Sequence, residues 1–339
     1  MLLIIVCFLP LAEAKMQGGS IQFMKPKAIA IHRQDVTLSL DKITSNYVFV
    51  NNSALEIIET IVFPAPYYPQ EKKKKFKEQQ QFNQLKIIVD GRDIEYKNIS
   101  LPISMHGEDL SEFFKSLGIS GDPTQIMASI NSNENSRHIR NALVEHKLID
   151  SKTNTPLWNN KTYYYWQQKF PPAQEVHVCQ TYKPNLKIYQ NNIQYKLQKP
   201  SKHSNSWLNK LINKEPQKPV VIVNQKREIK NLKDNLTKSF PYIKQFCPAN
   251  ADYLSLLHSV RTPWQQKLIS RELQYNLINN DNWSNAIDYF TLKIEHPENI
   301  PALSCWPHKF EHSSPTTLIF SATNYIPTQD IAILFLQNR

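Results

Sequence analysis

Apolar and polar positions alternate with a period of two through much of the chain, the pattern of half-buried β-strands. The clearest case is residues 35–69, which predict two long strands joined by a turn at Asn51–Ser53. The second strand ends on a Phe-Pro phrase, because proline has no N–H to donate to a neighbouring strand. A second Phe-Pro phrase follows the strand predicted at 162–169. The residues predicted to form this architecture are Tyr47, Phe49, Asn51, Phe63, Pro64, Pro66, Trp166, Phe170, Pro171 and Tyr182.

Between these two regions the periodicity changes. A strand at 82–89, the turn Asp90-Gly91 and a partner strand at 92–97 predict a hairpin. Apolar residues then recur at helical spacing in 108–117, 123–130 and 135–149. Strand character returns afterwards, so this helical block is interpreted as an insertion between strands of one unit.

Strands separated by regularly spaced turn residues are predicted from residue 266 to the end of the chain, a pattern typical of an antiparallel sandwich. The sequence therefore predicts a mainly β protein of two antiparallel β-sandwich-like units, with a helical insertion in the first. The predicted organisation is a signal peptide at 1–14, an N-terminal sandwich at 15–190 with its insertion at about 107–150, a basic, partly ordered insertion or linker at 191–240, and a C-terminal β-rich domain at 241–339.

The N-terminus indicates export. It is apolar from Leu2 to Leu11 and then passes through Ala12-Glu13-Ala14, which is typical of a signal peptide cleaved after Ala14. The apolar run is too short to span a bilayer, and no later stretch is long enough, so we expect no transmembrane span after cleavage.

The cysteines fit an exported protein. Cys179, Cys247 and Cys305 remain after cleavage, which permits one disulfide and leaves one thiol. We predict the disulfide between Cys247 and Cys305, both in the C-terminal part, and expect Cys179 to stay reduced.

The formal net charge of +11 is concentrated in two stretches. One is the basic segment that begins near residue 183, and the other is Lys72, Lys73, Lys74 and Lys75. Such runs are usually solvated loops, but they also predict possible contact with anions such as lipid head groups. Nucleic acid is not expected as a partner of an exported protein. Only 6 glycines are present, which argues against glycine-rich phosphate loops and nucleotide cofactors.

No catalytic or metal-binding pattern stands out. His308 and His312 are four residues apart, but Pro307 opposes the helix that would bring them together, and no CxxC pair is present. Cys179 and His177 share one face of a predicted strand, as a Cys-His hydrolase would need. A single strand supplies neither an oxyanion hole nor an orienting third group, so a packed cysteine is the favoured interpretation.

Several separated phrases, in this order, resemble those of a family of bacterial exported proteins catalogued as domain of unknown function 4424. They are YVFVNNS and TIVFPAP, then WQQKFPP and VHVCQTYKP, then IDYFTLKI, LSCW and NYIPTQDIAILFL. The resemblance covers the mature chain nearly end to end, and it implies export and a β-rich fold but no activity. The aromatic-x-aromatic-x-Asn strand and the F-P-x-P stop also resemble the vault and inter-alpha-trypsin type of β-sandwich, which implies a scaffold and adhesion module.

These observations favour an exported, non-catalytic envelope protein, periplasmic or at the cell surface, which acts as a binding or structural β-sandwich module without a cofactor. Its partner would be an envelope protein or polymer. Two alternatives stay open at this point. One is an exported hydrolase that acts on envelope polymers, and the other is a surface protein that binds anions through its Lys-rich loops.

Overall fold

The computed structural model describes residues 21–23, 28–65, 84–104, 106–132, 136–191, 230, 233–234, 237–238, 241–247, 268–277, 286–298, 300 and 302–338. The predicted signal peptide, Pro66, Lys72–Lys75 and most of the predicted linker at 191–240 lie outside these residues. None of the helices within the described ranges is long and apolar enough to cross a membrane.

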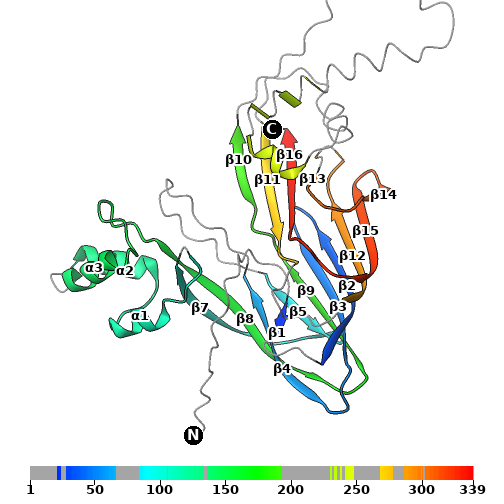
Figure 1. The fold of residues 1–339 in the computed structure, drawn as a ribbon, viewed down its shortest axis with the longest axis horizontal. Coiled ribbons are helices and arrows are strands. Elements are labelled where there is room, and N and C mark those ends of the chain that lie inside the picture. Colours follow the sequence, from blue (N-terminus) through cyan, green and yellow to red (C-terminus); the bar gives the residue numbers. More distant parts are fainter. Residues whose placement is uncertain are drawn as a thin grey trace, which may run out of the picture.

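An eight-stranded sheet forms one wall of the body (Figure 1). Its strands, in spatial order, are β14 (Glu311–Ser314), β15 (Thr317–Tyr325), β12 (Ile287–Glu295), β2 (Ile29–Leu38), β3 (Ile43–Asn51), β9 (Glu175–Tyr182), β5 (Lys86–Val89) and β6 (Arg92–Asp93). Residues at every second position of β3 are buried and those between them are more exposed. This alternation confirms the period-two pattern of the sequence.

The two strand-rich parts of the chain meet in this sheet. β12 pairs with β2 in parallel, with Leu292 opposite Val36, whereas the other strand pairs of the described sheets are antiparallel. A parallel pair needs a long connection, and here it joins strands separated by most of the chain. The mainly β class is therefore confirmed, and its two parts share one sheet; the predicted domain boundaries stay a prediction.

A second sheet contains both Phe-Pro strands. Its strands, in spatial order, are β1 (Gln22–Phe23), β4 (Ile57–Pro64), β8 (Trp158–Phe170) and β7 (Lys97–Ser104). β4 and β8 are antiparallel neighbours, so Phe63 lies opposite Tyr164 and Phe170 lies opposite Ile57. The two Phe-Pro phrases therefore end adjacent strands at opposite ends of the same pair.

A third sheet completes the body. Its strands, in spatial order, are β10 (Lys187–Asn191), β11 (Leu268–Tyr275), β16 (Ile331–Asn338) and β13 (Ala302–Ser304), and a short 3-10 helix, Pro241–Phe246, contacts β16. β10 falls in a stretch without clear periodicity, and the sequence analysis missed it. One hydrophobic core takes side chains from all three sheets.

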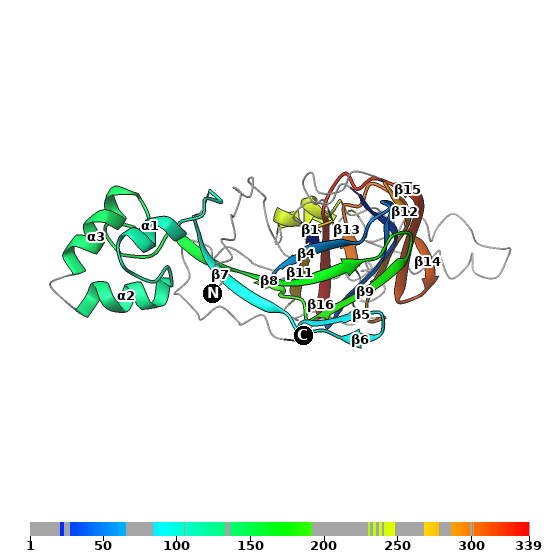
Figure 2. The ribbon, with the colours of Figure 1, turned by 90° about the horizontal axis from the view of Figure 1, so that it is seen from below.

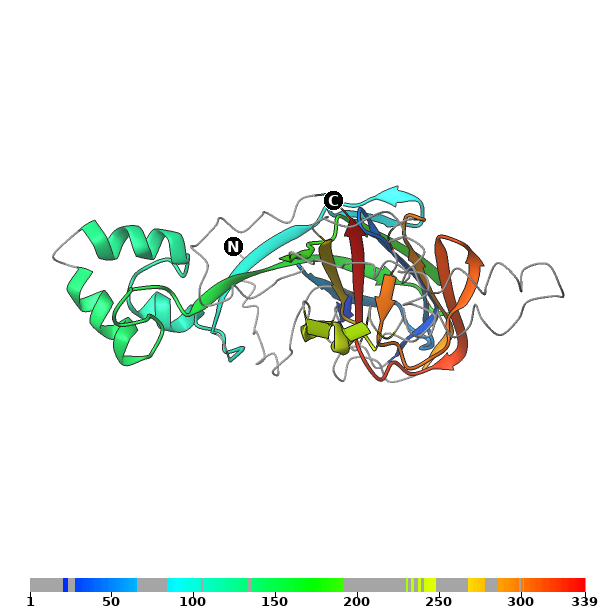
Figure 3. The ribbon, with the colours of Figure 1, turned by 90° about the horizontal axis from the view of Figure 1, so that it is seen from above.

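Helices α1 (Ser111–Ser116), α2 (Pro123–Ser132) and α3 (Ser136–Glu145) lie between β7 and β8, which confirms the helical insertion. Figures 2 and 3 show them as a head that β7 and β8 carry away from the body. The head has its own core, which includes Phe114, Leu143 and Trp158. Gly121 is needed there, because a Cβ would lie 2.6 Å from Pro102 Cγ. The backbone carbonyl of Gly121 accepts the indole N–H of Trp158 at 2.9 Å.

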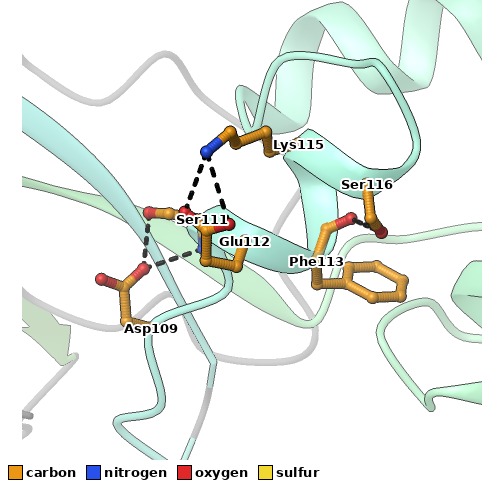
Figure 4. A network of polar contacts seen from close by, with 6 residues as sticks. All are labelled: Asp109, Ser111, Glu112, Phe113, Lys115 and Ser116. Atoms are coloured by element: carbon orange, nitrogen blue, oxygen red, sulfur yellow. Dashed lines mark hydrogen bonds and ion pairs between the residues drawn. The ribbon is translucent and has the colours of Figure 1, made fainter.

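A network of local polar contacts surrounds α1 (Figure 4). The backbone N–H of Ser111 donates to Asp109 Oδ1 at 2.8 Å, before the first turn. Lys115 Nζ lies 3.4 Å from Glu112 Oε1 one turn later, and the hydroxyl of Ser116 donates to the carbonyl of Phe113 at 2.7 Å. An acidic residue in the first turn and a basic one in the last turn also suit the helix dipole.

The predicted hairpin at 82–97 is only partly correct. Asp90 and Gly91 both have positive φ, 47° and 78°, as a tight two-residue hairpin turn requires. The partner strand β6 is short, however, and residues from Lys97 onward leave the eight-stranded sheet to pair with β8. Local alternation could not distinguish a continued hairpin from a strand that changes sheets.

Lys161 is a buried charged group on β8, near the base of the head. It is 8% exposed and lies opposite Leu101 of β7. Its Nζ lies 5.4 Å from the centroid of the Tyr163 ring, and no carboxylate of the described residues forms an ion pair with it. Burial lowers the pKa of Lys161 to about 7.

Candidate functional site: an aromatic cluster beside the disulfide

Most of the described residues predicted to form the architecture lie in the core where β3, β4, β8 and β9 meet. Tyr47 stacks on Phe49 with ring centroids 5.4 Å apart, and Phe63 packs on Tyr182 at 5.2 Å. The hydroxyl of Tyr47 lies 3.4 Å from that of Tyr275, and burial raises the pKa of Tyr47 well above its ordinary value. The members that the structure describes are Tyr47, Phe49, Asn51, Phe63, Pro64, Trp166, Phe170, Pro171 and Tyr182.

Asn51 joins three segments of this core and is fully buried. Its Nδ2 donates to the carbonyls of Leu55 and Phe170, both at 2.8 Å. Its Oδ1 accepts from the backbone N–H of Ser53 at 2.9 Å and from the Ser53 hydroxyl at 2.7 Å. Both ends of the amide are therefore bonded, and this residue holds the strand ends in place.

Cys179 and His177 lie on the outer face of the eight-stranded sheet, in a hollow of about 500 Å³. In the part of the chain that the structure describes they share no hydrogen bond, and His177 Nε2 lies 3.3 Å from Glu175 Oε2. Burial raises the pKa of the Cys179 thiol. A nucleophilic cysteine needs the opposite shift, so this arrangement does not activate the thiol.

The predicted disulfide between Cys247 and Cys305 is confirmed, and Cys179 is free. The disulfide anchors the segment that follows β13. Gln329 Nε2 donates to the carbonyl of Cys305 at 2.6 Å, and the hydroxyl of Ser304 donates to that of Ala332 at 2.9 Å. Trp306, the next residue, is therefore held by strand pairing, a covalent bond and two hydrogen bonds.

Trp306 belongs to a group of rings contributed by β12, β15 and the segment between β13 and β14. Strands β12, β14 and β15 lie together at one side of the body (Figure 1). The group runs from the core to the surface. The Tyr325 ring stacks on Phe290 with centroids 4.6 Å apart, and the Trp306 ring meets that of Phe320 edge-on at 5.7 Å. We call it the aromatic cluster, and its members are Phe290, Trp306, His308, Phe310, Phe320 and Tyr325.

Two polar atoms inside the aromatic cluster are buried without a partner. Trp306 is 8% and Tyr325 7% exposed, yet neither the indole N–H nor the phenol O–H has a hydrogen-bond partner among the described residues. Buried polar groups are nearly always bonded, and leaving one without a partner costs about 1–3 kcal/mol. Burial raises the pKa of Tyr325 to about 12, so its hydroxyl stays protonated at neutral pH.

The aromatic cluster differs from Gln180, another buried group that lacks partners within the described residues, in that it reaches the surface. Gln180 also has no hydrogen bond at either side-chain atom within the described residues, but it is completely buried in the core. In the aromatic cluster His308 is exposed, and Phe310 and Phe320 are half-buried. A ligand can therefore approach these rings from solvent.

The sequence analysis did not select the aromatic cluster. Trp306 and Tyr325 stand in the phrases LSCW and NYIPTQD, which carried only the family resemblance. Neither phrase has the spacing of a known site, and only the fold brings residues 290, 306, 320 and 325 together. The aromatic residues near both phrases were the one signal available.

Three sheets around one core define a mainly β protein of the sandwich type. The chain belongs to the family described as domain of unknown function (DUF4424), which matches residues 12–334. This membership confirms the family resemblance of the sequence phrases; the likeness to the vault type of sandwich stays a prediction.

Among solved structures, the chain is similar to a Legionella pneumophila protein described as a candidate nutrient binding protein. The two are 9% identical with a TM-score of 0.43, over 94% of this chain and 70% of the other. No curated protein matches the chain.

Proposed function

We propose that this protein is an exported, non-catalytic binding module of the cell envelope, located in the periplasm or at the cell surface. The observation that supports it most is the aromatic cluster, in which two buried hydrogen-bonding atoms lack partners among the described residues and lie beside half-buried rings. Binding sites typically combine apolar walls with a few polar groups that point at the ligand. The disulfide supports export, because disulfides persist in oxidising compartments.

The hydrolase alternative is less well supported. It would use Cys179 and His177, with Glu175 beside the imidazole. Burial raises the pKa of the thiol, however, and the two side chains share no hydrogen bond within the described residues. Anion binding by Lys72–Lys75 stays a proposal, because those residues lie outside the described ranges. Its signature would be binding to anionic vesicles that falls steeply with salt. A scaffold role, suggested by the vault-type resemblance, would need no small-ligand site.

The test is retention on envelope material. Tagged full-length protein is expressed in a bacterium and fractionated, and purified protein is then incubated with isolated envelopes. We expect the protein in the exported fraction. We expect the wild-type protein to be retained on envelopes and the Trp306→Phe, Tyr325→Phe double variant to be lost from them. The matched control is Tyr289→Phe, whose ring is 52% exposed. Recovery in the cytosol, or equal retention of wild type and double variant, would contradict the proposal.

A further inference from the structure

The ring of His308 occupies a stacking position on Phe320. The two rings are nearly parallel, at 10°, with centroids 4.6 Å apart. His308 is exposed and lies between Pro307 and Lys309, which are exposed as well. An exposed side chain therefore fills a place where a flat ring fits against a half-buried aromatic surface.

The two rings whose polar atoms lack partners within the described residues both lie beside the same position. The ring of Trp306 is 5.8 Å from that of His308, edge-on, and the ring of Tyr325 is also 5.8 Å away. His308 shares no hydrogen bond with either ring, and within the described residues the indole N–H and the phenol O–H have no other partner.

These features limit the chemistry of a ligand. An indole N–H only donates, so the ligand must offer an acceptor, and the Tyr325 hydroxyl can donate or accept. A quaternary ammonium would suit the rings but has no acceptor for Trp306. An anion would accept, and Lys309 is exposed next to His308, but stacking against Phe320 would remove much of the hydration of the charge, which is costly. A neutral ring that carries hydroxyls satisfies both requirements.

We infer that the position now taken by the His308 ring is a binding subsite for one neutral pyranose unit of a saccharide. The sugar ring stacks on Phe320, and its hydroxyls accept from Trp306 Nε1–H and bond to the Tyr325 hydroxyl. His308 holds the place when no sugar is bound and moves aside when one enters. This inference rests on the proposed function and names the ligand class of the same site.

The disulfide contributes preorganisation. It anchors Cys305, one residue before the indole that binds the sugar, so little conformational entropy is lost at Trp306 on binding. The half of the subsite formed by β12 and β15 is equally rigid, because Phe290 and Phe320 lie on paired strands. Only His308 has to move.

The test observes the indole N–H directly. Full-length protein labelled with ¹⁵N-tryptophan is titrated with neutral di- and trisaccharides of glucose, galactose, mannose and N-acetylglucosamine. Trp306→Phe identifies the Trp306 cross-peak by its loss. We expect that peak to move saturably with at least one sugar, because a new hydrogen bond forms at that nitrogen.

The variants separate the roles of the side chains. Trp306→Phe and Tyr325→Phe each keep a ring but remove one hydrogen-bonding group, and each is expected to weaken binding about tenfold. Phe320→Ala removes the stacking surface and is expected to weaken it at least as much. His308→Ala removes the competing ring and is expected to strengthen binding by about threefold to tenfold. Tyr289→Phe, on the other face of β12, is the control that changes nothing.

Two results would overturn the inference. One is a Trp306 peak that no sugar moves, even in His308→Ala; the other is sugar binding that survives Phe320→Ala unchanged. Thermal unfolding of each variant shows that loss of binding is not loss of folding. If envelopes retain the protein through Trp306 while no sugar moves its peak, the binding function stands and the ligand class is wrong. If both experiments fail, both proposals are wrong.

Discussion

Buried polar groups of the body differ in whether they find a hydrogen-bond partner. At the Phe-Pro end of the core, Asn51 is bonded at both ends of its amide. In the aromatic cluster, Trp306 and Tyr325 are nearly as buried and have no partners within the described residues. A satisfied buried group specifies structure, whereas one left without a partner costs stability and is usually retained for another role. The contrast assigns Asn51 a structural role and makes the aromatic cluster a candidate for binding. It is a contrast between residues and not between whole ends of the core, because Trp166 Nε1 on β8 also lacks a partner within the described residues.

The largest expected effect is at Asn51. Asn51→Leu removes the amide that bonds the carbonyls of Leu55 and Phe170 and the N–H of Ser53, and we expect the free energy of unfolding to fall by about 3–5 kcal/mol. Urea unfolding measures it. Asn52→Leu is the matched control, since Asn52 is exposed beside it and should change stability by less than about 0.5 kcal/mol. Similar losses at both positions would remove the contrast.

The disulfide gives the next largest effect. The double variant Cys247→Ser, Cys305→Ser loses the cross-link, and we expect a cost of about 2–4 kcal/mol in thermal unfolding. Cys179→Ser, the control at the free cysteine, should cost less than about 1 kcal/mol. Because the disulfide anchors Trp306, its loss should also broaden the Trp306 indole peak. A sharp, unmoved peak in the double variant would show that strand pairing alone positions the indole.

Lys161 extends the comparison to a buried group that carries a charge. Its pKa of about 7 lies below the ordinary 10.5. Between these values the unfolded chain binds more protons here than the folded one, so the free energy of unfolding should rise with pH from about 7 toward 10.5. Lys161→Met should remove that rise and stabilise the protein by about 1–3 kcal/mol at pH 7. The exposed Lys169→Met is the control, and the same pH dependence in wild type and Lys161→Met would refute the explanation.

The smallest expected change in stability is at Tyr325, and it tests most directly whether a buried hydroxyl lacks a partner. Tyr325→Phe removes a hydroxyl that has no partner within the described residues, so stability should change by less than about 1 kcal/mol or rise slightly. Tyr275→Phe removes a hydroxyl that lies 2.8 Å from Ser45 Oγ, and should cost about 1–2 kcal/mol. Chemical denaturation of both variants compares them. A clear loss in Tyr325→Phe would mean that its hydroxyl is already satisfied in the folded protein.

Much of the fold could be predicted because its signals are local. The alternation of β3, the Asp90-Gly91 turn and the helical block between β7 and β8 all follow from residues a few positions apart. The predictions from the sequence were wrong or missing where strand pairing depends on segments far apart in the chain. β7 continues an alternating pattern but pairs in another sheet, and β10 is a strand only because β11 lies beside it.

The candidate site was harder to predict for the same reason. The disulfide could be inferred, because few cysteines were available to pair. The aromatic cluster could not, since Phe290, Trp306, Phe320 and Tyr325 come from separate strands and a loop. No pattern in a sequence shows that a buried N–H will lack a partner, because this depends on every neighbour in space.

By itself the sequence determined a β-rich chain with a helical insertion, one disulfide and the family to which it belongs, since periodicity, proline stops and ordered phrases are written in neighbouring residues. Only the tertiary structure decided that β12 would lie parallel to β2, that Asn51 would be fully bonded, and that Trp306 and Tyr325 would be buried without partners. The reason is physical. Pairing and burial are set by contacts between distant segments, and these exist only once the chain has folded.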